Sequence, residues 1–336
     1  MTALAGVRVI ELEAKGPAPF GVMLLADLGA EVIQVRRPAP ADAGPGGAAG
    51  SRPAGTVALE RGRRFVALDL KAEPGVSQLL DLVAGADVLV ESHRPGVAER
   101  LGFGPDACLA RNPRLIYARM TGWGQDGPLA QAAGHDINFL AIAGALHPLG
   151  PADRPPSPPL NLVGDFGAGG AYLAIGLLAA LRERDRSGAG QVLDAAMVDG
   201  ISSMLTAFHA MRTSGDWSER REDNLVDGGC PWYRCYETAA GGYVAIGALE
   251  PRFQRLLLER LGLAIEQWPI ADRDQWPRQR AALAALFAAE PREHWERLFA
   301  GIDACVTPVL SLDESRVHPQ MLARASQPAF GLSAHA

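Results

Sequence analysis

The residues best suited to chemistry are one histidine and one carboxylate, thirty positions apart in the chain. His135 lies in the motif GHDINF at 134–139, and Asp165 lies in NLVGDFG at 161–167. A neutral imidazole can remove a proton near physiological pH, and a buried carboxyl with a raised pKa can return one from the opposite side. The pair therefore predicts two-base proton transfer at one carbon, as in a racemisation. The competing interpretation is that His135, one of seven histidines, is a hydrogen-bonded structural residue.

Because thirty residues exceed the reach of one helix face, the fold must bring the two segments together. Apolar runs typical of strands and amphipathic patterns typical of helices alternate along the chain. Strands are predicted at 7–12, 31–35, 65–70, 87–91, 115–120 and 191–195, and helices at 19–28, 76–83, 96–101, 165–184 and 197–213. This order predicts an α/β fold whose large domain is a doubly wound, Rossmann-like parallel sheet, with ligands at the carboxyl ends of its strands.

The domain boundaries follow from changes in the pattern. Residues 1–215 are expected to form the large domain, and 216–304 a smaller α+β domain with a hairpin at 233–246 and helices at 251–261, 276–289 and 292–299. Residues 305–336 are expected to return to the large domain. The Pro-, Gly- and Ala-rich stretch 38–56 is expected to be a lid or a structureless loop.

Composition excludes several classes of function. A net charge of −6 argues against a nucleic-acid or membrane-surface protein, so an anionic ligand needs locally placed arginines. The four cysteines form no Cys-x-x-Cys pair, which argues against a zinc site or a disulfide scaffold and favours a cytoplasmic setting. No G-x-G-x-x-G motif follows the first strand, which argues against a nicotinamide cofactor. The apolar stretch 166–181 is too short to span a bilayer and is expected to be a buried helix.

Several short motifs occur in the same order as in one known family. They are LAGV at 4–7, AEVI at 30–33, LDLK at 68–71, RPGV at 94–97, RLIYAR at 114–119, GHDIN at 134–138, DAAMV at 194–198, GALEP at 247–251 and DACVTP at 303–308. On these residues the chain resembles the class III CoA-transferase family, and within it the members that racemise 2-methylacyl-CoA thioesters. The resemblance covers nearly the whole chain.

The resemblance implies a site and a substrate. His135 and Asp165 correspond to the acid/base pair of the racemases, with Glu250 close to the aspartate and Asp136 beside the histidine. The substrate would be a 2-methyl-branched acyl-CoA. No separate cofactor is implied, because CoA is part of the substrate, and no metal is implied. Family members form interlocked homodimers, so a dimer is expected, in which Glu250 could come from the other chain.

The resemblance also assigns residues to CoA, whose phosphates suit the bidentate geometry of arginine. The residues that match the family's CoA contacts are Arg37, Leu68, Asp69, Leu70, Lys71, Ser92, His93, Arg94, Arg100, Gly134, Ile137, Asn138 and Phe139. Relatives often have an acidic residue before Arg37, whereas this chain has Arg36, which is expected to alter the phosphate contacts. Relatives usually run on beyond the position of Leu310, so the short tail puts part of the dimer packing in question.

Three further interpretations stay open. Met197, Met204 and Met211 recur every seven residues, which is typical either of one flexible wall for an acyl chain or of ordinary core packing. The chain could instead be a CoA-transferase in which Asp165 attacks the thioester and forms a mixed anhydride. A non-catalytic acyl-CoA-binding protein is the third interpretation. The intact GHDIN motif favours the racemase, because the transferases of the family do not need a base at His135.

Overall fold

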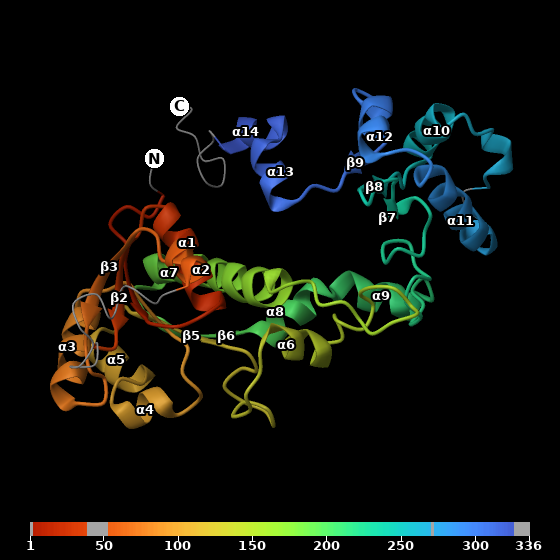
Figure 1. The fold of residues 1–336 in the computed structure, drawn as a ribbon. Helices are drawn as coiled ribbons and strands as arrows, with labels where there is room; N and C mark the ends of the chain where they lie inside the picture. Colours follow the sequence, from red (N-terminus) through yellow and green to blue (C-terminus); the bar gives the residue numbers. More distant parts are fainter. Residues whose placement is uncertain (1–2, 39–52, 270–271, 326–336) are drawn as a thin grey trace. The chain divides into compact units, whose positions relative to one another are not determined.

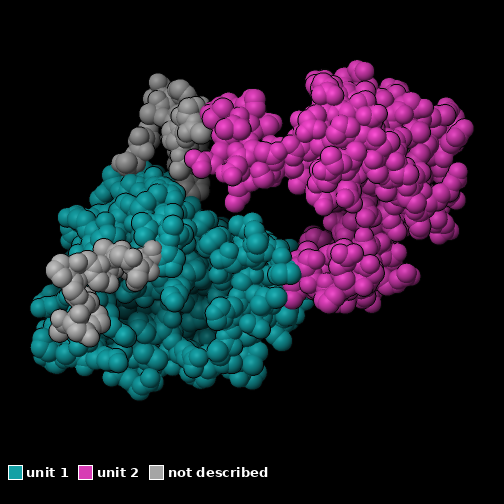
Figure 2. All heavy atoms as spheres, in the orientation of Figure 1, with its two compact units in different colours: residues 1–145, 158–206, 329–336 teal, residues 146–157, 207–328 magenta. Residues whose placement is uncertain are grey.

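The computed structural model describes residues 3–38, 53–269 and 272–325. The chain divides into two compact units: unit 1 contains the described residues of 1–145 and 158–206, and unit 2 those of 146–157 and 207–328 (Figure 2). The division differs from the expected boundaries, because the large unit ends at Thr206 and residues 146–157 join unit 2. Most of the stretch 38–56, for which a lid or loop was predicted, lies outside the described residues.

Unit 1 is built on a six-stranded sheet in which all neighbouring strands are parallel (Figure 1). Its strands are β1 (Arg8–Leu12), β2 (Glu31–Arg36), β3 (Arg63–Ala67), β4 (Val88–Glu91), β5 (Ile116–Thr121) and β6 (Gln191–Ala196). Their order across the sheet is β3-β2-β1-β4-β5-β6. The predicted doubly wound fold is therefore confirmed. The order reverses between β1 and β4, and such a switch point is where ligands bind in open α/β sheets.

Helices cover both faces of this sheet because both faces of its strands are apolar. Residues that point to one face pack with α3 (Glu73–Ala84), α4 (Val97–Leu101) and α5 (Pro105–Arg111), and this core includes Ile10, Leu79, Leu89, Phe103 and Tyr117. The alternate strand residues Val9, Val88 and Ile116 are equally buried. On the other side, α1 (Pro17–Asp27) packs against α7 (Tyr172–Ser187). A short helix, α2 (Ala54–Leu59), precedes β3.

The helix predicted at 165–184 begins earlier and in a different form. Residues Leu162–Ala171 form a π-helix, η1, which continues directly into α7. Together they are long and apolar enough to cross a membrane by length and composition, which contradicts the expectation that this stretch is too short. The combined helix contacts α1, α8 (Met197–Met204), β5 and β6, with Leu173 and Leu177 fully buried. The helix is therefore buried along one side only, because Leu162 and Ile175 are 57% and 60% exposed, and the prediction of a buried helix holds in part.

Two other expectations need correction. The helix predicted at 197–213 is broken into α8 and α9 (Thr206–Ser214), which belong to different units. Met197 and Met204 therefore lie on α8 and Met211 on α9, so the three methionines do not share one helix. Residues 306–308, expected to return to the large domain, form β9 (Val306–Pro308), which pairs with β8 of unit 2. The free edge of β8 in the predicted hairpin thus forms backbone hydrogen bonds with residues 306–308.

Unit 2 combines an antiparallel sheet with helices. The sheet is β7 (Tyr233–Glu237), β8 (Tyr243–Gly247) and β9, and it includes the predicted hairpin. The helices are α10 (Pro251–Arg260), α11 (Trp276–Phe287), α12 (Arg292–Phe299), α13 (Leu312–Val317) and α14 (Pro319–Ala325). Its core is rich in aromatic residues, among them the buried Trp232, Phe287 and Trp295.

Candidate active site

Two cavities open at the carboxyl ends of the strands of unit 1. The first cavity, of about 420 Å³, lies beyond β1, β2 and β3 and is lined by Glu13, Arg36, Arg37, Leu68, Asp69, Leu70, Lys71, His93 and Val97 with neighbouring apolar residues. The second cavity, of about 440 Å³, lies beyond β1, β4 and β5. It is lined by Lys15, Gly16, Ser92, His93, Arg94, Trp123, Gly134, His135, Asp136, Phe139, Asp165 and Met197, among others. Both lie where the sheet topology predicts ligands.

The first cavity presents exposed positive charge. Arg37 is the exposed residue directly after β2, and Lys71, also exposed, lies in the turn between β3 and α3. The Asp69 carboxylate accepts the N–H of Lys71 at 3.0 Å and so shapes this turn. Gly75 lets α3 approach the turn closely, since a Cβ there would lie 2.1 Å from the carbonyl oxygen of Asp69. The geometry suits a bound phosphate, which guanidinium and ammonium groups recognise.

Arg36 differs from its neighbour because its guanidinium already has protein partners. Its Nε donates to Gln34 at 2.6 Å and its Nη2 to Glu60 at 2.7 Å, and the group stacks 3.4 Å from the centre of the Phe65 ring. Gln34 in turn donates to the buried Glu11 at 2.9 Å. The extra arginine of this chain therefore belongs to a network on the wall of the first cavity.

His135 is positioned by the start of a short helix, α6 (Asp136–Ile142). The backbone N–H of His135 donates to the Asn138 side chain at 3.0 Å, and its carbonyl accepts the Asn138 N–H at 2.8 Å. Phe139, buried beneath, packs so tightly against Gly122 that a Cβ there would lie 2.1 Å from its ring. The imidazole itself is exposed in the second cavity. This arrangement fixes the backbone and leaves the ring free to meet a substrate.

Asp165 is positioned by the π-helix. Its backbone N–H donates to Asp136 Oδ1 at 2.6 Å, and a Cβ on Gly164 would lie 2.4 Å from the same oxygen. The Asp165 carboxylate accepts the Asn161 side chain at 3.3 Å and lies against the loop after β1, where a Cβ on Gly16 would come within 3.0 Å. π-helices are rare and recur at functional sites. Here the π-helix directs Asp165 into the cavity that also contains His135.

Burial raises the pKa of Asp165 above its usual value. A hydrogen bond from Asn161 opposes this shift, the neighbouring Asp136 adds to it, and the nearby His135 opposes it. Burial likewise raises the pKa of Asp136, against the backbone N–H groups of Asp165 and Gly164. A carboxyl with a raised pKa holds its proton more readily, as a general acid requires.

Comparison with known proteins identifies the family. The family model described as CoA-transferase family III matches residues 4–328. The chain belongs to this family. It is 45% identical over 96% of its length, and over 82% of the relative, to a protein named alpha-methylacyl-CoA racemase from Mus musculus. It is 42% identical to the Homo sapiens protein of the same name, over the same shares of both chains. A crystal structure of a CaiB/BaiF family protein from Brucella suis superposes with a TM-score of 0.80 at 29% identity, covering 96% of this chain and 88% of that one.

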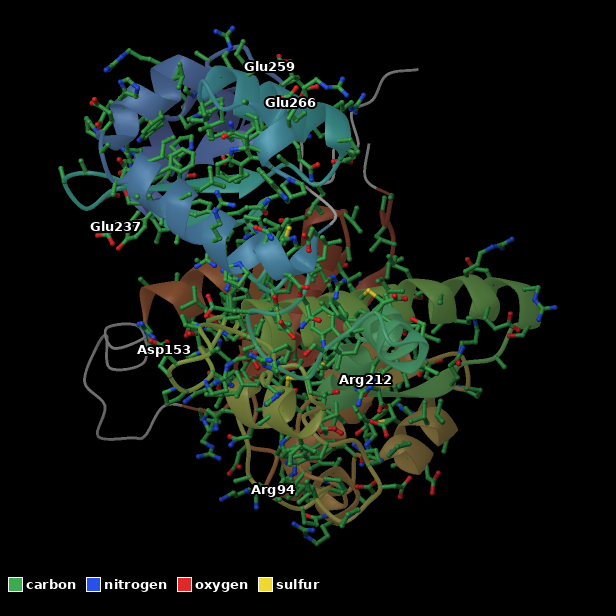
Figure 3. The ribbon with its side chains drawn as sticks, turned by 90° about the vertical axis from the view of Figure 1, so that its right-hand side faces the viewer. Arg94, Asp153, Arg212, Glu237, Glu259 and Glu266 are labelled. Atoms are coloured by element: carbon green, nitrogen blue, oxygen red, sulfur yellow. The ribbon has the colours of Figure 1, made fainter. Side chains whose placement is uncertain are left out.

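Most residues assigned by the family resemblance gather at the two cavities. Leu68, Asp69, Leu70, Lys71 and Arg37 line the first; Ser92, Arg94, Gly134, His135, Asp136, Phe139 and Asp165 line the second; His93 lines both. Arg94 projects at the periphery of unit 1, where it is labelled in Figure 3.

Four assigned residues do not line either cavity. Arg100 is exposed and donates to the carbonyl of Gly96 at 3.2 Å. Ile137 and Asn138 lie on α6, where Asn138 holds the backbone of His135. Glu250 belongs to unit 2, where it is the exposed N-cap residue of α10, so its expected place beside the aspartate stays a prediction.

Sequence reasoning did not assign several residues that line the second cavity. Lys15 and Gly16 follow β1, and their place at the carboxyl end of a predicted strand was an available signal. Trp123, whose ring meets Phe139 edge to face at 4.7 Å, follows the predicted strand at 115–120 and carried the same signal. Of Met197, Met204 and Met211, only Met197 lines the second cavity, which Met120 also lines. Among the described residues, no group of three or more His, Cys, Asp or Glu side chains is placed to hold a metal ion.

Proposed function

We propose that this protein racemises 2-methylacyl-CoA thioesters by proton transfer at C2, with His135 and Asp165 as the two bases. The observation that carries the proposal is that these two residues, from segments thirty residues apart, line one cavity. The likeness to proteins named alpha-methylacyl-CoA racemase supports the same reaction. CoA enters as part of the substrate, with its phosphates at the cations of the first cavity and its acyl group in the second.

The chemistry follows from the acidity of the thioester. The carbonyl makes the neighbouring C–H acidic, so one base removes the C2 proton and leaves a planar enolate. The other group, protonated at the start, then delivers its proton to the opposite face of C2. In one direction neutral His135 is the base and protonated Asp165 is the acid, and in the reverse direction the roles exchange. The raised pKa of Asp165 supports its role as the acid.

Asp136 is best interpreted as a positioning residue for Asp165. Its carboxylate accepts the N–H of Asp165 at 2.6 Å, so this N–H is not free to stabilise an enolate oxygen. A shift in Asp136 would move the first turn of the π-helix and the acid with it. The resemblance placed Asp136 beside the catalytic histidine. Its hydrogen bond with the N–H of Asp165 supports a role in which Asp136 positions Asp165 and does not touch the substrate.

The rival function is CoA transfer, in which the Asp165 carboxylate attacks the thioester carbonyl and the CoA thiolate leaves. The family description supports this possibility. His135 in the same cavity has no necessary role in that reaction, which favours the racemase.

The test is to incubate the protein with a single-enantiomer 2-methylacyl-CoA in deuterated water and to follow deuterium at C2 together with configuration. We expect both label and the opposite enantiomer to appear. His135→Ala should lose interconversion by roughly 10²–10⁴-fold, the usual contribution of a general base. His294→Ala, on α12 of unit 2, is a matched control that should retain activity.

The same samples distinguish the rival reaction. An added ¹⁸O-labelled free acid would pass ¹⁸O to Asp165 if a mixed anhydride formed and broke down, and mass spectrometry of the peptide containing residue 165 detects it. CoA transfer with ¹⁸O on Asp165, but no deuterium at C2, would overturn the racemase proposal.

We also propose that the protein acts as an interlocked homodimer in the cytoplasm and that Glu250 completes the site from the partner chain. Exposed apolar side chains on unit 1 support a self-association surface: Ile142, Leu160, Leu162 and Ile175 are each between 57% and 73% exposed. Sedimentation at micromolar concentration tests the dimer, and a species of twice the chain mass is expected.

A further inference from the structure

Lysine is rare in this chain: it occurs twice, as Lys15 and Lys71, against thirty arginines. Both lysines line a cavity, Lys71 the first and Lys15 the second. Because arginine supplies the surface charge elsewhere, composition alone does not account for a lysine at these two positions. The lysine ammonium is a compact charge on a flexible four-carbon stem, so it can follow a bound anion to different places.

Lys15 is exposed, and its ammonium has no ion pair or hydrogen bond with any other part of the chain that the structure describes. It does not act on the proposed acid, Asp165, either. Besides burial, the groups that shift the pKa of this acid are Asn161, Asp136 and His135. The positive charge of Lys15 therefore remains available to a molecule bound in the second cavity.

The position of Lys15 in the chain places it beside the acyl part of the substrate. It follows β1, and the next residue, Gly16, lies so close to Asp165 that a Cβ there would come within 3.0 Å of Oδ2. Asp165 exchanges its proton with C2, so the backbone of Lys15 lies near the acyl group. The phosphates of CoA are expected at Arg37 and Lys71, in the other cavity. The charge of Lys15 is thus suited to an anion on the acyl group.

Much of the second cavity is apolar, which makes an unpaired charge unfavourable there. Met120, Trp123, Phe139 and Met197 contribute to its wall. A hydrocarbon acyl chain that displaced water from the Lys15 ammonium would give it no new partner. A carboxylate on the acyl chain would pair with the ammonium, and such charge-assisted hydrogen bonds are stronger than neutral ones.

We propose that the second cavity binds 2-methylacyl groups that carry a carboxylate at their far end, and that Lys15 binds this carboxylate. The substrates would be CoA half-thioesters of 2-methyl dicarboxylic acids. The proposal rests on the proposed function, since it specifies the acyl group of that reaction. Lys15 takes no part in proton transfer: it selects the acyl chain, and His135 and Asp165 exchange the proton at C2.

Matched pairs of thioesters test the proposal. In one pair, 2-methylglutaryl-CoA, with the thioester next to the methyl-bearing carbon, is compared with 2,5-dimethylhexanoyl-CoA, in which an isopropyl group replaces the carboxylate. Two further pairs have one chain carbon fewer and one more. For at least one pair, Lys15→Met should lower kcat/KM of the carboxylated thioester about tenfold or more, which corresponds to one charged contact, and should spare its isopropyl partner.

Two variants serve as controls. Lys15→Arg keeps the charge and should retain most of the preference for the carboxylated thioester. Lys71→Met removes the other lysine and should lower kcat/KM of both members of a pair by the same factor, because its expected contact is with the CoA part that they share. If Lys15→Met also affected both members of every pair equally, the proposal would be overturned, since Lys15 would then act on CoA or on the enolate. Unchanged kinetics with every pair would overturn it as well.

A binding measurement separates this proposal from the proposed function. Reductive ¹³C-methylation labels the two lysines and the α-amino terminus and keeps their charge, and the Lys15→Arg variant identifies the NMR signal of Lys15. The carboxylated thioester should shift the signals of Lys15 and Lys71, and the isopropyl thioester that of Lys71 alone.

The two proposals can then fail separately. If no thioester exchanged deuterium at C2 but the carboxylated one still shifted the Lys15 signal, the racemase function would be rejected and the carboxylate site would stand. If the isopropyl thioesters were racemised and no carboxylated thioester shifted the Lys15 signal, the function would stand and the carboxylate site would be rejected.

Discussion

The two cavities of unit 1 are built in different ways. The first is formed by the regular ends of parallel strands and the turns that follow them, and its cations, Arg37 and Lys71, are exposed. The second includes irregular backbone, a ten-residue π-helix, although both cavities depend on close contacts that only glycine permits. A binding surface can thus be built from exposed side chains, whereas proton transfer needs groups held within a fraction of an ångström.

The charged side chains of the two cavities also differ in how far they are buried. In the first cavity Arg37 and Lys71 stay in solvent, where each can reorient toward a phosphate at little desolvation cost. In the second, Asp136 is buried and Asp165 is partly buried, and burial raises the pKa of both. Substitutions in the two cavities should therefore affect different kinetic parameters.

After the loss of His135 itself, the largest effect is expected from Gly164→Ala in the second cavity. The new Cβ would lie 2.4 Å from Asp136 Oδ1, so the contact that holds the N–H of Asp165 must give way. We expect kcat to fall about 100-fold, since displacement of a reacting group by about 1 Å has this effect. Steady-state kinetics of racemisation measures it. Gly55→Ala, where a Cβ would meet nothing within 4 Å, is the control. An unchanged kcat would show that Asp136 does not position the acid.

A smaller effect, on a different parameter, is expected in the first cavity. Lys71→Ala should raise KM for acyl-CoA about tenfold with little change in kcat, because it removes a charge-assisted contact to the ground state and the transition state alike. The loss should shrink as salt screens the contact. Arg111→Ala is the control, since Arg111 pairs with Asp81 on the surface at 2.8 Å and lines neither cavity. If Lys71→Ala lowered kcat at unchanged KM, the first cavity would not be a site of substrate binding alone.

The smallest effect is one of stability. Because the pKa of Asp165 is raised in the folded state, the folded protein binds this proton more tightly than the unfolded chain does. The resulting stabilisation is present below the unfolded-state pKa and is lost as pH rises through the folded-state pKa. Asp165→Asn should therefore melt about 2 °C above wild type at pH 7, and this advantage should vanish toward pH 4. Melting curves across this pH range measure the difference; an advantage that grew on acidification would contradict the raised pKa.

The fold was largely predictable because apolar patterning is a local signal. Strands placed at 7–12, 31–35 and 115–120 occur within one or two residues of those positions, as β1, β2 and β5. The π-helix was not predictable, because its backbone depends on contacts that 162–171 make with α1 and α8. The break after Met204 and the pairing of 306–308 with β8 likewise depend on packing between distant segments.

The amino-acid sequence defines which reactions the side chains can support. A histidine and a carboxylate in ordered motifs, cations after predicted strands and the absence of a dinucleotide motif can all be recognised in a linear chain. The packing of the chain, in contrast, brings His135 and Asp165 into one cavity, places Arg36 against Glu60, and sets the His93 ring against Glu91 at the edge of both cavities. The physical reason is that residue types and spacing set local conformation and charge, whereas proximity, burial and hydrogen-bond partners arise only when distant strands and loops pack together.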